Sequence, residues 1–223
     1  MRIRDMDYLE THNDCRLEHF TDLNEYKTRV QYLKGENIFK QGAFSPYVIY
    51  VLKGLVKVYL QTGLDKQINI SITKPGDFLA FSSIFGETVH TYSTQALTDA
   101  EICMIEKERL KQILLQYPKF ALQVTSKNYR TEKHLLEIIK NISYKQMRGK
   151  LASALLYLSH EDFLNKDIFS FLSRQDIADF ASISAESAIK FLKEFEKENI
   201  VILDGKNIEI SDKDKLMNIS KNG

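Results

Sequence analysis

The chain has 223 residues, and its 31 lysines and arginines against 30 aspartates and glutamates leave a formal net charge of +1. This balance argues against a polybasic nucleic-acid arm or a strongly acidic tail. Two cysteines, Cys15 and Cys103, are too few for a disulfide framework, a four-thiolate zinc site or a four-thiolate iron–sulfur cluster within one chain.

The first segment, MRIRDMDYLE, is charged throughout and lacks the apolar core of a signal peptide. No later apolar run approaches the roughly 20 residues that span a bilayer, so we expect a cytoplasmic protein. If residues 12–19 form a helix, His12, Cys15 and His19 share one face, and His and Cys ligate zinc and heme iron. A polar helix surface explains them better, because a fourth ligand is not evident. They are weak metal candidates, and we predict no bound metal.

Short β-like segments separated by glycines follow. Six of the nine glycines lie between positions 35 and 86, and the segments between them are rich in Val, Ile, Tyr and Phe. This spacing predicts an antiparallel sandwich, barrel or roll. Gly54 interrupts one long β-like run, which predicts a bend or bulge. The alternation of Ile68, Ile70 and Ile72 predicts a strand with one buried face.

Residues 119–142 contain no Gly or Pro and predict a long helix. Its a/d pattern over about three heptads, with Asn at one a position, is typical of a two-stranded coiled coil, in which a buried Asn favours dimers. An amphipathic helix lying on its own domain explains the pattern equally well. The predicted dimer seam consists of Ala121, Val124, Asn128, Thr131, Leu135, Ile138 and Ile142.

Two helices around a tight turn are predicted near the C-terminus. The run from Ser173 to Asp176 resembles a capping box, with Asp in place of the usual Glu, and opens a short helix. After a brief turn, Ser184 caps a longer helix whose apolar residues share one face. This is the helix-turn-helix pattern. Two β-runs around the DG turn at residues 204–206 predict a hairpin, and hence a winged helix-turn-helix.

The order of roll, long helix and winged helix-turn-helix resembles the Crp–Fnr transcription regulators over about residues 25–215. The residues that carry the resemblance are LKGENIFKQGAFSPYVIYVLKGLVKVYL and TKPGDFLA in the roll, RGKLASALLYL at the junction, and LSRQDIADFASISAESAIKFLKEFEKENIV in the C-terminal part. The resemblance implies an α+β fold. Its parts are an effector-binding-like antiparallel β-roll (a cyclic-nucleotide-binding-like jelly roll) with an N-terminal helix over 1–117, a dimerisation helix over 118–144, and a winged helix-turn-helix DNA-binding domain over 145–223.

The same resemblance implies a homodimer with double-stranded DNA, RNA polymerase and a small-molecule effector as partners. The start of the second helix then reads bases in the major groove. Glu186 can accept a hydrogen bond from cytosine N4, and Lys190 can donate to guanine, although the family pattern has Arg there and Lys lacks the bidentate fork. Ser173, Arg174 and Gln175 match positions that hold phosphates in relatives. The predicted DNA-binding residues are Ser173, Arg174, Gln175, Ser184, Ala185, Glu186, Ser187, Lys190 and Lys206.

Two features of this region depart from the usual pattern. Residues 173–200 carry four basic and six acidic residues, a net charge of −2, which is not the usual basic footprint and predicts weak non-specific affinity for DNA. Ser182 stands where relatives often have Gly, so a positive φ there would cost free energy.

The effector-binding stretch also departs from the family pattern. Ala80-Phe81 replace a Gly-Glu pair, and His90-Thr91 replace an Arg-Ser pair. A cyclic phosphate needs a cationic or donor-rich cradle, which a neutral histidine does not supply. We therefore expect the usual cyclic-nucleotide mode to be lost and the effector to be of another kind. The candidate pocket residues are Ala80, Phe81, Phe85, His90, Thr91, Tyr92 and Leu135.

No P-loop, GxSxG, HExxH or GxGxxG motif is present, so we do not expect an enzyme. Three hypotheses stay open. The first is a sequence-specific transcription regulator. The second is a heme- or metal-dependent redox or nitric-oxide sensor of the same fold, with ligands among His12, Cys15, His19 and His90. The third is a dimeric scaffold that does not bind DNA.

Overall fold

The computed structural model describes residues 27–64, 66–160 and 167–223, and the side chains of Lys27 and of 127–133 lie outside that description. The chain divides into two compact units. The roll unit holds the described residues up to Gln61 together with Ser71–Lys133. The C-terminal unit holds Thr62–Ile70 and His134–Gly223. The tip of one hairpin and the end of the long helix therefore group with the C-terminal part, which the expected boundaries at 117 and 144 do not anticipate.

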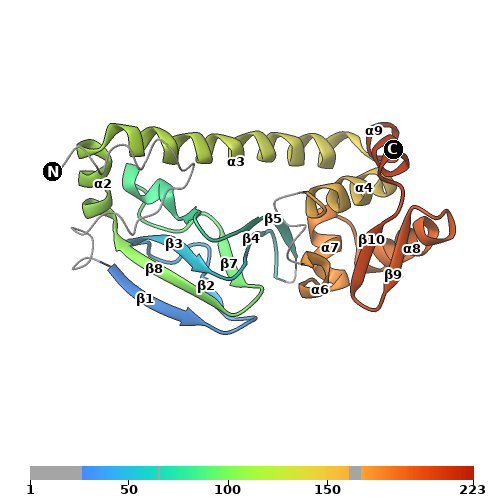
Figure 1. Ribbon diagram of the computed structural model, residues 1–223, viewed down its shortest axis with the longest axis horizontal. Helices are drawn as coiled ribbons and strands as arrows, with labels where there is room; N and C mark the ends of the chain where they lie inside the picture. Colours follow the sequence, from blue (N-terminus) through green and yellow to red (C-terminus); the bar gives the residue numbers. More distant parts are fainter. Residues whose placement is uncertain (1–26, 65, 161–166) are drawn as a thin grey trace. The chain divides into compact units, whose positions relative to one another are not determined.

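Two four-stranded sheets form the predicted β-roll. They are drawn from blue to green in Figure 1. In the order of pairing, the first sheet is β1 (Lys27–Tyr32), β8 (Ala100–Glu106), β3 (Tyr47–Lys53) and β6 (Phe78–Leu79), and the second is β2 (Asn37–Phe39), β7 (Ser93–Ala96), β4 (Val56–Gln61) and β5 (Gln67–Thr73). The strands of β1–β8, β8–β3, β3–β6, β2–β7 and β7–β4 pair in antiparallel directions.

Gly54 lies where the chain leaves β3 and enters β4, which belong to different sheets. The bend expected at this glycine is confirmed. Its φ is +83°, and a Cβ placed on it would lie 2.4 Å from the carbonyl oxygen of Asp99. The close approach of this neighbouring backbone requires a residue without a side chain.

The strand β5 differs from its expected one-sided burial. Ile70 and Ile72 are buried, but Asn69, on the opposite face, is only 1% exposed. Asn69 is covered because its side-chain amide donates to the backbone oxygen of Asp176, 3.0 Å away. Alternation of apolar residues marks only the apolar face, so it misses a polar side chain that is buried by hydrogen bonding.

Beyond the sheets, the short helix η3 (Phe81–Phe85) follows β6, and α2 (Lys107–Gln116) leads into the 27-residue helix α3 (Pro118–Tyr144). Proline suits the first position of α3, where no helical partner awaits its missing N–H. Phe120 and Val124, near the start of α3, pack with Ile105 and Leu110 in the core of the roll unit.

The C-terminal unit contains the predicted helix-turn-helix and wing (orange to red in Figure 1). Its core is built from leucines of the first helix and apolar residues of the next ones, among them Leu151, Leu155, Ile177 and Phe195, each with no exposed surface. Its elements are α4 (Met147–Leu158), α6 (Ile168–Phe171), α7 (Arg174–Ala181), α8 (Ala185–Lys197), β9 (Val201–Asp204), β10 (Asn207–Ile210) and α9 (Lys213–Asn222).

The ends of α7 are as the sequence indicates. Ser173 and Asp176 form the capping box in both directions, with Asp in the place of Glu. Ser182 ends the helix with φ 52° and ψ 47°, in the left-handed region. Its hydroxyl is buried and finds no hydrogen-bond partner in the part of the chain that the structure describes. The positive φ considered for this serine is therefore present, and the serine also buries a polar atom.

Gly54→Ala should destabilise the roll unit by about 3 kcal/mol, because it adds a backbone clash to the strain of a positive φ. Gly42→Ala is the matched control, since Gly42 has nearly the same φ, +82°, with no atom within 4 Å of its virtual Cβ. We expect about 1 kcal/mol for that variant. Chemical denaturation measures both, and equal losses would contradict the clash.

Ser182→Gly should stabilise the protein by about 1 kcal/mol, because glycine adopts the left-handed conformation without strain and removes the buried hydroxyl. Ser182→Ala removes only the hydroxyl and keeps the strain, so it separates the two effects. The free energy of unfolding from urea titration is the measurement. A less stable Ser182→Gly variant would show that the turn does not strain the chain.

Candidate nucleic-acid interface

The helix α8 has one buried and one exposed face. Ala188, Leu192 and Phe195 are almost fully buried, at the i, i+4 and i+7 spacing that places side chains on one side of a helix. At the start of the helix, the Ser184 hydroxyl accepts a hydrogen bond from the backbone N–H of Ser187, 3.2 Å away. This cap satisfies one of the free N–H groups of the first turn.

Two of the residues expected to read bases, Glu186 and Lys190, lie on the exposed face. The backbone N–H of Glu186 and the hydroxyl of Ser184 lower the pKa of the Glu186 carboxyl, so it is ionised and accepts hydrogen bonds at neutral pH. Among the described residues no ion pair joins Glu186 to Lys190. Both head groups can therefore reach another molecule.

Ile189 belongs to the same exposed face, and the sequence reasoning missed it. It is 40% exposed although it is a large apolar residue. It lies three residues after Glu186, a spacing that places both on one side of a helix. An apolar side chain at this position can contact the methyl group of thymine. The helical period could have identified it, because Ile189 falls outside the apolar face of this helix.

Arg174 connects the start of α7 to the wing. Its guanidinium donates to the backbone oxygens of Gly205, at 2.8 Å, and Lys206, at 3.2 Å. Burial lowers the pKa of Arg174, but its guanidinium stays charged at neutral pH. In this arrangement Arg174 holds the turn of the β9–β10 hairpin, and Lys206 is exposed at that turn.

The other two predicted phosphate contacts are also engaged locally. The Ser173 hydroxyl belongs to the capping box with Asp176. The exposed Gln175 donates from Nε2 to Oδ1 of Asp179, 2.8 Å away. Oδ2 of the same carboxylate accepts from Nε2 of Gln67, also at 2.8 Å. Asp179 is 7% exposed, and no sequence pattern pointed to it or to Gln67.

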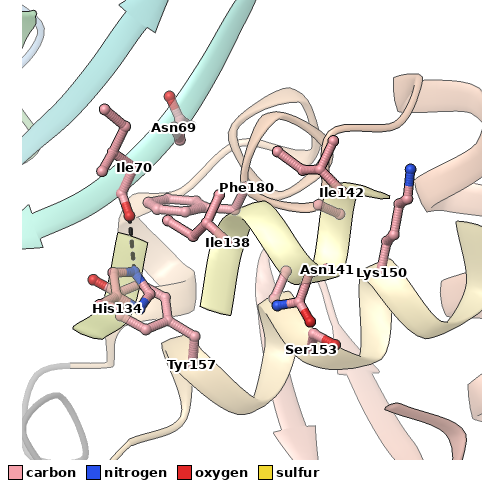
Figure 2. Close-up of a pocket in the computed structure, with 12 residues that line it drawn as sticks. Asn69, Ile70, His134, Ile138, Asn141, Ile142, Lys150, Ser153, Tyr157 and Phe180 are labelled. Carbon is pink, nitrogen blue, oxygen red and sulfur yellow. Dashed lines mark hydrogen bonds between the residues drawn. The ribbon is translucent and has the colours of Figure 1, made fainter. Parts of the chain in front are cut away.

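A small cavity of about 30 Å³ lies within the C-terminal unit, between the ends of β5 and α3 and the helices α4 and α7 (Figure 2). This is room for one or two water molecules. His134 Nε2 lies 2.9 Å from the backbone oxygen of Ile70, and the His134 ring stacks on Tyr157 with centroids 4.2 Å apart. Burial is the main cause that lowers the pKa of His134, so the ring is neutral at pH 7 and donates to Ile70.

In the roll unit, most of the candidate effector residues lie around η3. The backbone N–H of Ala80, which caps η3, donates to the Tyr92 hydroxyl at 2.7 Å. His90 stacks on Phe39 with ring centroids 3.8 Å apart, and the Phe39 and Tyr92 rings lie 5.5 Å apart. Burial lowers the pKa of His90, which leaves the ring neutral at pH 7 and without a charge for an anion.

The remaining candidates for this pocket are less enclosed. Phe81 is half-buried, and its ring meets Phe85 edge-on, with centroids 6.0 Å apart. Phe85 is 80% exposed, and Thr91 is exposed as well. Leu135 lies on the part of α3 that belongs to the C-terminal unit and is 38% exposed.

The predicted dimer seam coincides with the exposed apolar side chains of α3 at Leu135, which is 38% exposed, but not at its other described apolar positions. Val124 is 1% exposed and belongs to the roll core, whereas Ile138 and Ile142 line the cavity of the C-terminal unit. The side chains of Asn128 and Thr131 lie outside the described residues. Among the large apolar side chains of α3, Tyr144 at the last position is 86% exposed, and Leu122, Leu136 and Ile139 are 70%, 62% and 60% exposed.

The metal candidates His12, Cys15 and His19 lie outside the described residues. Within the described ranges, no three His, Cys, Asp or Glu side chains cluster closely enough to hold a metal ion. Cys103 is buried on β8. No helix in the same ranges is long and apolar enough to cross a membrane.

Comparisons with known proteins agree with this architecture. A model of the cyclic nucleotide-binding domain matches residues 29–117, and a model of the Crp-like helix-turn-helix domain matches residues 149–219. The fumarate and nitrate reduction regulatory protein of Vibrio cholerae is 26% identical over 214 residues, which cover 94% of this chain and 84% of that protein. The cAMP-activated global transcriptional regulator CRP of Salmonella typhimurium is 24% identical over 188 residues, covering 81% and 88%.

Solved structures show the same fold. FixK2 from Bradyrhizobium japonicum matches with a TM-score of 0.75 and 18% identity, covering 86% of this chain and 96% of that one. A CooA mutant from Carboxydothermus hydrogenoformans matches with a TM-score of 0.76 and 22% identity, covering 96% and 94%. Both family models, in this order along one chain, agree with the resemblance that the sequence suggests. The chain therefore belongs to the Crp–Fnr family of DNA-binding transcription regulators.

Proposed function

We propose that the protein is a homodimeric transcription regulator that reads the major groove with α8 and responds to an effector other than a cyclic nucleotide held in the family's usual way. The observation that carries the first part is the exposed face of α8. Glu186 and Lys190, near the start of the helix, combine an acceptor and a donor, and Ile189 adds an apolar contact. Together they match the cytosine, guanine and thymine groups that the major groove presents.

Affinity must come from a few directed contacts. The helix-turn-helix region has a net charge of −2, so the general attraction to the phosphate backbone is small. Backbone contacts then fall to local donors at the start of α7 and at Lys206 in the wing. Two copies of the site, joined in a dimer, double the number of such contacts and make a modest single site sufficient.

The dimer is proposed to form along α3, through the exposed pair Leu136 and Ile139 in the part of α3 that belongs to the C-terminal unit. Ile139 follows Leu136 by three residues, which is a and d spacing. These two positions each lie one residue after the seam positions Leu135 and Ile138 expected from the sequence, and Ile138 lines the cavity of the C-terminal unit.

The effector proposal rests on the region around η3. The Ala80 N–H donates to Tyr92, and His90 is neutral and stacked on Phe39. Neither the cation nor the free donors that a cyclic phosphate needs are supplied by these residues. Aromatic side chains of the chain itself occupy this region, which favours either an apolar effector or a roll that holds its fold without one.

Glu186→Ala and Lys190→Ala should each weaken binding to a DNA site enriched from random sequence by about tenfold and relax its sequence preference, because each removes a base contact in both half-sites. Glu196→Ala and Lys197→Ala are matched controls, since they make the same changes at exposed positions near the end of α8. Fluorescence anisotropy at fixed salt gives the Kd values. Equal effects in both pairs would contradict base reading by the start of α8.

Ile139→Asp should raise the dimer dissociation constant roughly 100-fold, because it places a charge on the apolar seam once in each protomer. Leu64→Asp, at a 96% exposed position, is the control and should leave the dimer intact. Sedimentation velocity over a range of concentrations makes the comparison. A wild-type monomer at micromolar concentration, or an unchanged Ile139→Asp dimer, would refute this interface.

A further inference from the structure

A chain of side-chain amides within the C-terminal unit joins the hairpin tip to the first helix of the helix-turn-helix. Gln67 Nε2 donates to Asp179 Oδ2 at 2.8 Å and to Asn69 Oδ1 at 3.2 Å. Asn69 Nδ2 donates to the backbone oxygen of Asp176 at 3.0 Å. On the other side of the carboxylate, Gln175 Nε2 donates to Asp179 Oδ1 at 2.8 Å.

The carboxylate of Asp179 determines which amide atoms of Gln67 and Gln175 face it. An ionised Asp only accepts hydrogen bonds, so each glutamine that binds it must present its nitrogen and not its oxygen. Gln67 uses both hydrogens of its amide nitrogen, one for Asp179 and one for Asn69. Gln175 uses one for Asp179. The second hydrogen on Nε2 of Gln175 can donate to another molecule, because this side chain is exposed. It lies at the start of α7, which is proposed to face the DNA backbone.

Burial makes the arrangement costly to disturb. Asp179 is 7% exposed and Asn69 is 1% exposed, and a buried carboxylate is stable only while donors surround it. If Gln67 withdraws, Asp179 loses one of these donors and must turn toward water or toward another donor. The carboxylate then no longer holds the amide of Gln175 in one orientation.

We propose that Gln67 and Asp179 are positioning residues for DNA binding: Gln67 orients Asp179, and Asp179 orients the amide of Gln175 to donate to a DNA phosphate. This inference rests on the proposed function. It assigns to the β4–β5 hairpin a part in DNA affinity through its hydrogen bond to Asp179. The strand β5 continues from Ile70 into the roll unit. An effector that moves this strand therefore acts on Gln67 through the covalent backbone.

The hairpin tip is also held in a second place, which does not involve the hydrogen bonds from Gln67 and Gln175 to Asp179. We call those hydrogen bonds the relay. His134 donates to the backbone oxygen of Ile70 at 2.9 Å and stacks on Tyr157 (Figure 2). A change at Gln67 therefore alters the relay while this attachment remains. The effect of such a change on DNA binding reports on Gln175 and not on loss of the whole hairpin.

The test compares Gln67→Glu with Gln61→Glu, which makes the same change at an exposed position on the same hairpin. The carboxylate introduced by Gln67→Glu would face Asp179 with a like charge and no donor, so we expect the Kd for a DNA site enriched from random sequence to rise about tenfold. Gln61→Glu should stay within twofold of wild type. Gln67→Ala, which removes the donor and adds no charge, should give a smaller loss of about threefold.

Two further variants show whether the effect passes through the relay. Gln67→Glu combined with Asp179→Asn exchanges acid and amide, so the new amide at position 179 donates to the new carboxylate at position 67 and accepts from Gln175. Asn69 Oδ1 accepts from the amide nitrogen of Gln67 in wild type and loses that donor in this pair, so the pair should recover most, but not all, of the affinity that Gln67→Glu loses. In a Gln175→Ala background, Gln67→Glu should have almost no additional effect, because the residue it acts on is absent.

The outcomes distinguish this inference from the proposed function. If wild type and Gln61→Glu bind DNA and Gln67→Glu binds equally well or more tightly, the relay is wrong and the proposed function stands. The relay is also wrong if the acid–amide exchange fails to restore binding, or if Gln67→Glu loses as much affinity without Gln175 as with it. If wild type shows no sequence-dependent binding in any arm, the proposed function and the inference fail together. Thermal melts show whether each variant is folded. If Gln67→Glu is unfolded, the DNA affinity of Gln67→Ala is compared with that of wild type instead.

Discussion

The apolar core of the C-terminal unit determines which side chains α8 can offer to DNA. Leu192 and Phe195 are buried, along with Ile177 of α7 and Leu155 of α4, and a helix with one face fixed in this way cannot rotate without exposing that face to water. Glu186, Ile189 and Lys190 are outward-facing as a consequence. Under the proposed function, the specificity of the regulator therefore depends on packing between buried residues of this core.

Under the proposed function, electrostatics in this region restrain DNA binding and do not drive it. The helix-turn-helix carries more acidic than basic residues, and its best-placed cation, Arg174, binds backbone oxygens of the wing. Such a site holds arbitrary DNA weakly and depends on a correct arrangement of donors and acceptors. This makes the orientation of single side chains such as Gln175 more important than in a strongly basic protein. It is also the reason why we propose that the buried carboxylate of Asp179, which accepts from Gln67 and Gln175, influences DNA affinity.

Local patterns in the sequence predicted local structure well. Ser173 and Asp176 indicated the capping box, and the DG turn indicated the wing hairpin, because each signal lies within a few residues of the structure it forms. Long-range contacts were beyond such patterns. The hydrogen bond between Gln67 and Asp179 joins residues far apart in the chain. The long helix shows a third case: heptad spacing identified some of its apolar positions and left out Leu136 and Ile139, and only the structure shows that the roll core covers Val124.

The most direct test of the account is the sequence that purified wild-type protein enriches from a random pool of double-stranded DNA, with and without extract of its source cells. A dimer that places two α8 helices in successive major grooves predicts an inverted repeat, with half-sites centred about 10 base pairs, or a multiple of that, apart. Enrichment of no sequence in either arm, or of a motif without twofold symmetry, would contradict the account.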